Sequence, residues 1–342
     1  MRGARYHLEV GALVVEDLPK PKVKPGTVLL KVRYCGICGS DLTRYRQLSN
    51  PSEGMRKLLG KISPVPGHEI CGIVERDGSP VVVHPQLGCG KCPPCSSGYW
   101  GGCLRPDETA LIGVQFDGGL AEYVAVPFDH LIPLSKQGDD DLKKAVLAEP
   151  LAVALHMMHS AEPAKGESFF VIGDGPIGLL LFQLLIHLGY EKTTLVGRHE
   201  KKMTIARRAN GGRVSAEEEI TEEFHATVRC VFHTAGSQAA FDLGLRLLEP
   251  SGRMVTIGYL YGGKGLEPAA FNALIRNEKK LYGCYSYSFD EMREALNFIE
   301  SGAIDVTPLI GQVVPLENCV KDGFDPLVAS DPAPGKVLIR IP

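Results

Sequence analysis

The chain has 342 residues, more than one hydrophobic core usually serves, so its length favours two domains. A hydrophobic content of 44%, a charged content of 23% and a net charge of −3 are ordinary for a globular protein. They give no electrostatic basis for binding nucleic acid or an anionic membrane, so we expect neither as a partner.

The first part of the chain, residues 1–150, is predicted to form a β-rich, barrel-like domain. Short runs of β-branched and apolar residues are broken there by Gly and Pro, which is typical of such domains. The predicted strands cover residues 28–34, 70–75, 81–84 and 121–126.

After Glu149, strands alternate with helices, which predicts a doubly wound parallel sheet over residues 151–288. The predicted strands cover residues 168–172, 193–196, 229–233 and 253–257, and the predicted helices cover 177–188, 200–210 and 238–248. The longest apolar run is the first of these helices, and it is too short and too polar to span a bilayer. A helix over 290–301 and a strand over 336–341 follow. We expect this tail to rejoin the first domain, which would then comprise residues 1–150 and 289–342.

A candidate open metal site is spread over the first domain. Cys38, His68, Glu69 and Glu149 supply a thiolate, an imidazole and one or two carboxylates. Such a set leaves a position for water or a substrate oxygen, which a catalytic zinc requires. Taken singly, each residue also has a structural explanation, since a histidine in a glycine turn is more often structural.

Four cysteines lie close together between residues 89 and 103. Cys89, Cys92, Cys95 and Cys103 follow the spacing C-x2-C-x2-C-x7-C, which is typical of a closed tetrahedral zinc site. A closed site has no place for substrate, so we expect a structural role. The clustered thiols favour a reducing, cytoplasmic location, and the N-terminus lacks the apolar core of a signal peptide. The other cysteines show no partner pattern and are expected to be small buried hydrophobic residues: Cys35, Cys71, Cys230, Cys284 and Cys319.

A glycine turn follows the first strand of the second domain. Gly173, Gly175 and Gly178 form G-x-G-x-x-G, and Pro176 and Ile177 open the next helix. The first glycine permits a tight turn, the second a close approach of a pyrophosphate, and the third close packing of helix on strand. The helix N-terminus favours phosphate. We expect a dinucleotide site here, with a plain tight turn as the alternative.

The end of the second strand indicates which dinucleotide binds. Chains that bind NAD usually place Asp or Glu there for the ribose hydroxyls. This chain has Gly197, Arg198 and His199 instead. Because a guanidinium can donate two hydrogen bonds to a phosphate, we expect NADP, with NAD also possible. The alternative is a solvated basic start of a helix.

Together these motifs resemble the zinc-dependent medium-chain alcohol and polyol dehydrogenases. The matching segments cover almost the whole chain in the expected order: CGICGSDL, PGHEICGIVE, the four-cysteine loop, DGGLAEYV, AEPLAVALH, the glycine turn and GKVLIRI. The resemblance implies an α/β protein with a GroES-like catalytic domain and a Rossmann domain, and an active site in the cleft between them. Glu149 followed by Pro150 is similar to the sorbitol, butanediol and threonine dehydrogenase branch.

The resemblance also implies individual roles. Either Glu69 or Glu149 would complete the catalytic zinc site, and the sequence does not choose between them. Ser40 matches the hydroxyl of the proton relay, while Thr43 stands where many relatives carry a histidine. Relatives form dimers and tetramers, so the resemblance implies a homo-oligomer.

The implied reaction is reversible oxidation of an alcohol to a carbonyl, with hydride passing to the nicotinamide. Sugars, polyols, vicinal diols, threonine and simple alcohols all fit, so the substrate stays open. A zinc-free quinone or enoyl reductase of the same superfamily is one alternative, although Cys38, His68 and the intact cysteine loop argue against it. A non-enzymatic, zinc-stapled binding protein is the other.

Overall fold

The computed structural model describes residues 1–59, 63–209, 211–260, 265–329 and 335–342. The chain divides into two compact units, and each is described by itself. The first unit contains Met1–Glu149 and Ser288–Pro342, and the second contains Pro150–Tyr287. In these described ranges, no helix has both the length and the apolar character that crossing a membrane requires.

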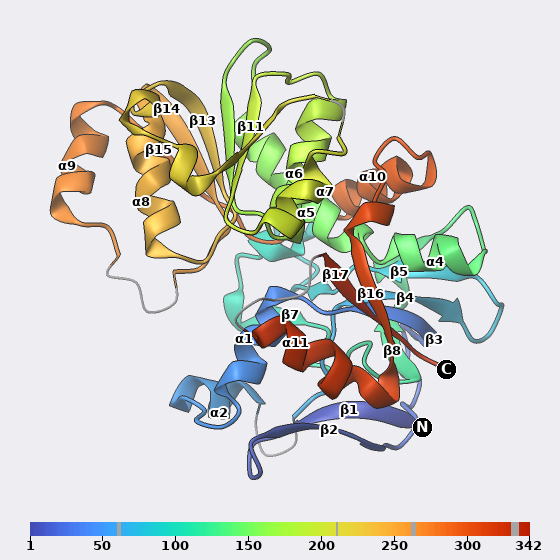
Figure 1. Cartoon of the computed structure of the whole chain (residues 1–342). Helices are drawn as coiled ribbons and strands as arrows, with labels where there is room; N and C mark the ends of the chain where they lie inside the picture. The colour runs from blue at the N-terminus through green and yellow to red at the C-terminus, as the bar shows by residue number, and fades with distance from the viewer. Residues whose placement is uncertain (60–62, 210, 261–264, 330–334) are drawn as a thin grey trace. The chain divides into compact units, whose positions relative to one another are not determined.

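The first unit is built on a seven-stranded sheet (Figure 1). Its strand order is β16-β17-β3-β4-β5-β9, and β8 pairs with β3 outside this path. The strands are β3 (Thr27–Gly36), β4 (Glu69–Val74), β5 (Pro80–Val83), β8 (Tyr123–Pro127), β9 (Leu131–Pro133), β16 (Ile310–Pro315) and β17 (Lys336–Arg340). Strand β17 pairs with β3, so the end of the chain lies in the sheet of the first unit. The predicted strands 28–34, 70–75, 81–84 and 121–126 are confirmed, with ends that differ by at most two residues.

Short elements surround this sheet. They are the hairpin β1 (Arg2–His7) and β2 (Ala12–Asp17), the pair β6 (Gln86–Leu87) and β7 (Ala110–Leu111), and the helices α1 (Gly39–Gln47), α2 (Glu53–Leu59), α3 (Pro93–Ser96), α4 (Asp139–Ala145), α10 (Phe289–Glu300) and α11 (Asp325–Val328). The core between them is aliphatic and includes Leu30, Val32, Ile70, Val337 and Ile339, all at most 1% exposed. Burial of these branched side chains stabilises the sheet by roughly 1.5–3 kcal/mol for each.

The second unit is a parallel sheet of six strands in the order β12-β11-β10-β13-β14-β15 (Figure 1). The strands are β10 (Phe169–Ile172), β11 (Thr193–Gly197), β12 (Arg213–Ala216), β13 (Val228–His233), β14 (Leu248–Thr256) and β15 (Lys280–Gly283). The strand order reverses between β10 and β13, and ligands of such sheets bind at the carboxyl ends beside this reversal. The chain is therefore an α/β protein with a GroES-like and a Rossmann-like part.

The helices of the second unit are α5 (Ala148–Ala161, which begins in the first unit), α6 (Pro176–His187), α7 (Glu200–Ala206), α8 (Gln238–Leu247) and α9 (Pro268–Arg276). Pro176 and Ile177 form the first turn of α6, as predicted. The helix predicted over 200–210 is too long, because α7 ends at Ala206; residue 210 itself lies outside the described ranges. Cys284 is half-buried rather than buried, while the other four isolated cysteines are buried.

Candidate metal centres and cofactor pocket

Three of the candidate metal ligands meet where β3 passes into α1 and β4 begins. Cys38 directly precedes α1, and His68 and Glu69 stand at the start of β4. One donor atom from each of these residues lies within 4.8 Å of the other two, and His68 and Glu69 are buried. A thiolate, an imidazole and a carboxylate are three protein ligands, the number that catalytic zinc sites use when one position stays open.

Two glycines make room for this set. Gly36 pairs with Glu69 across β3 and β4, and a Cβ at Gly36 would lie 1.9 Å from Oε2 of Glu69. Gly67 has a φ of +94°, and a Cβ there would lie 2.5 Å from Sγ of Cys35. A side chain at Gly36 would therefore displace Glu69, and one at Gly67 would strain the backbone that leads into His68.

Negative charge gathers around the buried His68. Burial alone would lower the pKa of His68, but Cys38 and Asp41 raise it to about 10. The buried Asp41 places Oδ2 3.8 Å from Nδ1 of His68, and the same oxygen accepts the backbone N–H of Cys38 at 3.1 Å. Glu149, in the first turn of α5, also raises the pKa of His68. A bound cation would neutralise this charge.

Three polar atoms at the site are buried and have no hydrogen-bond partner among the described residues. They are Oγ of Ser40, Nδ1 of His68 and Oε2 of Glu69. A buried polar atom without a partner costs roughly 1–3 kcal/mol, so the site is built for a bound group that satisfies it. The donors present fit a zinc ion, with Glu69 in the group and Glu149 close to it.

Lys336 contacts Glu69 through the carboxylate oxygen Oε1. It opens β17 and forms an ion pair with the remaining oxygen of the Glu69 carboxylate. No pattern in the sequence links these residues, because strand order alone brings them together.

The sulfurs of the four-cysteine loop form a second, separate group. All four lie within 4.8 Å of one another. The sulfurs of Cys89 and Cys95 are 3.9 Å apart, and those of Cys92 and Cys103 are also 3.9 Å apart. Four Zn–S bonds of about 2.3 Å in a tetrahedron place sulfurs about 3.8 Å apart. The loop therefore fits a zinc ion that is fully coordinated by protein.

Backbone hydrogen bonds and burial shift the pKa values of these thiols in opposite directions. The N–H groups of Leu104 and Cys95 lower the pKa of Cys92 to about 6, whereas burial raises the pKa of Cys95 to about 12. Trp100 and Phe289 pack against the cluster. Cysteine binds zinc as the thiolate, so a bound cation would hold Cys95 in this form despite its burial.

The glycine turn lies between β10 and α6. Gly173 has a φ of +125°, and a Cβ there would lie 2.5 Å from Oγ1 of Thr234. A Cβ at Gly178 would lie 2.0 Å from the carbonyl oxygen of Gly173, so the third glycine lets the helix pack closely on the turn. At Gly175 a Cβ would meet no described atom within 4 Å, which leaves the backbone open to a ligand.

Asp174, between the first two glycines, fixes the segment that follows β11. Its buried Oδ2 accepts the backbone N–H of Arg198 at 2.8 Å and of His199 at 2.7 Å, and lies 2.9 Å from Nδ1 of His199. Burial alone would raise the pKa of Asp174, but these hydrogen bonds lower it. A Cβ at Gly197 would lie 3.0 Å from Oδ2 of Asp174. The sequence showed no role for Asp174, because its partners follow a different strand.

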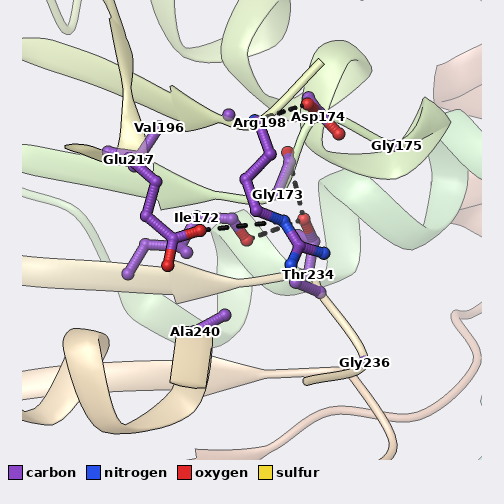
Figure 2. Close-up of a pocket in the computed structure, with 12 residues that line it drawn as sticks. Ile172, Gly173, Asp174, Gly175, Val196, Arg198, Glu217, Thr234, Gly236 and Ala240 are labelled. Atoms are coloured by element: carbon purple, nitrogen blue, oxygen red, sulfur yellow. Dashed lines mark hydrogen bonds and ion pairs between the residues drawn. The ribbon is translucent and has the colours of Figure 1, made fainter. Parts of the chain in front are cut away.

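Arg198 lines a pocket at the carboxyl ends of the strands, together with Gly173, Gly175 and Glu217. Figure 2 shows the Arg198 guanidinium and the Glu217 carboxylate pointing toward one another; Nε and Oε2 are 3.7 Å apart. The side chain of Arg198 is 59% exposed, so a ligand can reach it. Turn amides, the start of α6 and a guanidinium are groups that bind dinucleotide phosphates.

Two family models match the chain. The model for the alcohol dehydrogenase GroES-like domain matches residues 24–136, and the model for the zinc-binding dehydrogenase matches residues 176–301. The matched ranges together cover more than half of the chain. The first lies within the first unit, and the second covers most of the second unit and continues into α10 of the first.

Named relatives agree with these matches. D-xylulose reductase A from Aspergillus oryzae is 28% identical over 326 residues, with 89% of this chain and 87% of that protein covered. Galactitol 1-phosphate 5-dehydrogenase from Escherichia coli K12 is 26% identical over 351 residues, with 96% and 97% covered. A solved zinc-binding dehydrogenase from Sinorhizobium meliloti, bound to NADP, has a TM-score of 0.83 at 27% identity over 99% of both chains. The chain therefore belongs to the zinc-binding, medium-chain alcohol dehydrogenase family and is an oxidoreductase that acts on alcohols.

Proposed function

We propose that this dehydrogenase oxidises a polyol, or a related diol or sugar alcohol, reversibly to the carbonyl compound, with NADP as its preferred cofactor. The observation that carries the proposal is the grouping of Cys38, His68 and Glu69 within 4.8 Å beside a buried hydroxyl. The relatives named for D-xylulose and galactitol 1-phosphate support a polyhydroxylated substrate.

In this proposal Cys38, His68 and Glu69 hold the catalytic zinc, and Glu149 is the carboxylate that can exchange with Glu69. A zinc ion supplies Lewis-acid chemistry there, and a nicotinamide cofactor accepts the hydride. Oγ of Ser40 would relay the proton of the substrate hydroxyl, accepting it while donating its own hydrogen onward to water or the cofactor ribose. Its lack of a partner among the described residues leaves Oγ available for this role.

The second unit binds the cofactor. The amides of Gly173 and Gly175 and the first turn of α6 hold the pyrophosphate, and Arg198 holds the 2′-phosphate. Gly197 and His199 flank Arg198 in this part of the site. Asp174 fixes the backbone of His199. Pro176 and Ile177 form the first turn of α6, and Gly178 lets the start of this helix pack closely on the turn. The NADP in the Sinorhizobium meliloti relative supports this assignment.

The four-cysteine loop holds a structural zinc in this proposal. Its sulfur spacing matches a tetrahedral site in which Cys89, Cys92, Cys95 and Cys103 supply every ligand. Because cysteines bind metal only in their reduced form, we infer a reducing, cytoplasmic location.

We also infer a homo-oligomer that forms through strand β15. This strand ends the sheet of the second unit, and all four of its residues are exposed. Leu281 is 41% and Tyr282 is 39% exposed, and an exposed apolar strand edge invites pairing with a second copy. Light scattering should give the mass of two or more chains for the wild type and of one chain for Leu281→Glu/Tyr282→Glu. Val10→Glu, at an exposed position of the first unit, should keep the wild-type mass.

The test of the main proposal is a screen of polyols, sugar phosphates, diols and simple alcohols with NADP and NAD, on protein whose zinc content has been measured. We expect turnover of a polyol with NADP and loss of turnover in Cys38→Ser with the fold intact by circular dichroism. Cys284→Ser, half-buried and outside both cysteine groups, is the matched control and should stay active. Full activity of zinc-free protein would instead favour the zinc-free reductase.

A further inference from the structure

Strand pairing in the second unit places a carboxylate beside Arg198. The register of β11 and β12 pairs Gly197 with Ala216. The next residue of each chain segment, Arg198 and Glu217, therefore leaves the same edge of the sheet at neighbouring positions. Nε of Arg198 and Oε2 of Glu217 are 3.7 Å apart, and both residues line the cofactor pocket (Figure 2).

We propose that Glu217 is a specificity-determining residue, whose carboxylate competes with the 2′-phosphate of NADP for the guanidinium of Arg198. The inference rests on the proposed function, in which Arg198 binds that phosphate. Carboxylate and phosphate oxygens accept hydrogen bonds from a guanidinium with the same geometry, so they compete for the Nε side of Arg198.

The competition affects the two cofactors differently. The 2′-phosphate carries a charge of about −1.5 to −2 near pH 7, as other phosphate monoesters do, and it must displace Glu217 and then lie close to it. NAD carries a neutral hydroxyl in place of the 2′-phosphate, so Glu217 does not repel it. Glu217 therefore lowers the preference for NADP that Arg198 creates, and the wild-type protein should use both cofactors.

The other carboxylate near Arg198 does not act in this way. Asp174 is buried and accepts the backbone N–H groups of Arg198 and His199, so it is part of the turn itself. The side chain of Glu217, by contrast, is 30% exposed at the start of the short helical turn Glu217–Glu219, and it can rotate into solvent. A phosphate can thus displace Glu217 without disturbing the fold.

The test compares Glu217→Gln with Glu218→Gln, which removes the same charge from the next, exposed residue. Dissociation constants for NADPH and NADH are measured by fluorescence titration of the zinc-loaded, full-length protein. An exposed ion pair contributes up to about 1 kcal/mol, so we expect Glu217→Gln to bind NADPH roughly three- to fivefold more tightly. Its affinity for NADH, and both affinities of Glu218→Gln, should change less than about twofold.

Three other outcomes would overturn the inference. An unchanged NADPH affinity would show that Glu217 does not compete. Weaker NADH binding alone would show that Glu217 accepts the ribose hydroxyls instead. An equal gain from Glu217→Gln in the Arg198→Ala background would show that plain charge repulsion, rather than competition for Arg198, is responsible.

The proposed NADP preference is tested by a different variant. It is refuted if Arg198→Ala leaves the affinity for NADPH unchanged, whatever the effect of Glu217→Gln. When Arg198→Ala weakens NADPH binding and Glu217→Gln has no effect, the role of Glu217 alone is refuted.

Discussion

Lys336 and Glu69 form a buried ion pair across 267 positions of sequence, with Nζ 2.5 Å from Oε1. Their side chains are 4% and 1% exposed. Nζ also donates to the carbonyl oxygen of Ile37 at 3.2 Å, in the residue before Cys38. Lys336 thus holds one oxygen of Glu69 and leaves Oε2 without a protein partner among the described residues, available to a metal.

Replacing Lys336 with methionine should therefore destabilise the first unit. Removing one partner of a buried pair leaves the other charge unpaired, at a cost of about 3–5 kcal/mol. We expect Lys336→Met to unfold at a lower urea concentration than the wild type and to carry less zinc per chain, as measured by tryptophan fluorescence and metal analysis. The double variant Lys336→Met/Glu69→Gln, which buries no charge, should recover the urea midpoint but not the catalytic zinc. A wild-type midpoint in Lys336→Met would contradict this account.

Replacing Cys95 with serine should remove the structural zinc. Cys95 is buried and its sulfur belongs to the tetrahedral group, so a loss of one ligand opens the site. Metal binding at such sites contributes folding free energy, on the order of several kcal/mol or more. We expect one zinc fewer per chain and a lower thermal midpoint, whereas Cys71→Ala, at a buried cysteine outside both groups, should keep its full zinc content. Unchanged zinc content in Cys95→Ser would rule out the structural site.

Replacing Ser40 with alanine tests the proton-transfer role. The loss of a positioned proton acceptor typically lowers kcat by roughly a hundredfold or more, while zinc content and NADPH affinity should stay close to wild type. Thr43→Ala is the matched control on the same helix, because Oγ1 of Thr43 already donates to the carbonyl oxygen of Gly39 at 3.1 Å. A loss in Thr43→Ala as large as in Ser40→Ala would place Thr43 in the proton path.

Local patterns in the sequence predicted most of these features. The role of Gly178 follows from its contact with the nearby Gly173, and the spacing of the four cysteines identifies their loop without knowledge of the fold. The pairs Lys336–Glu69 and Arg198–Glu217 could not be predicted in the same way. Strand order brings the first pair together, and strand register brings the second pair together. No local sequence pattern around these residues indicates either pairing.

The choice between Glu69 and Glu149 as the zinc ligand could not be predicted from the sequence either. Both carboxylates lie in segments that resemble the family, and their spacing does not indicate which one binds zinc. In the structure, Glu69 joins Cys38 and His68 because β3 and β4 pair Glu69 with Gly36, whose missing side chain leaves the necessary space.

His233 should make the second unit sensitive to acid. The residue ends β13 and is 0% exposed, with Nδ1 2.8 Å from Oγ1 of Thr256 and with Nε2 lacking a hydrogen-bond partner within the described part of the chain. Burial lowers the pKa of His233 to about 4. In the unfolded chain the same group takes up a proton below about pH 6.5.

The sign of the effect follows from this difference. Between about pH 6.5 and pH 4 the unfolded state binds more protons than the folded state, so stability falls as the pH falls, by up to about 3 kcal/mol for this group. We expect the thermal midpoint of the wild type to fall more between pH 7 and pH 4.5 than that of His233→Gln, which keeps a polar side chain without a titratable ring. Other groups that titrate in this range, including the buried His130 of the first unit, are present in both proteins and cancel in the comparison. Equal falls in the two proteins would show that the pKa of His233 does not differ between the folded and the unfolded state.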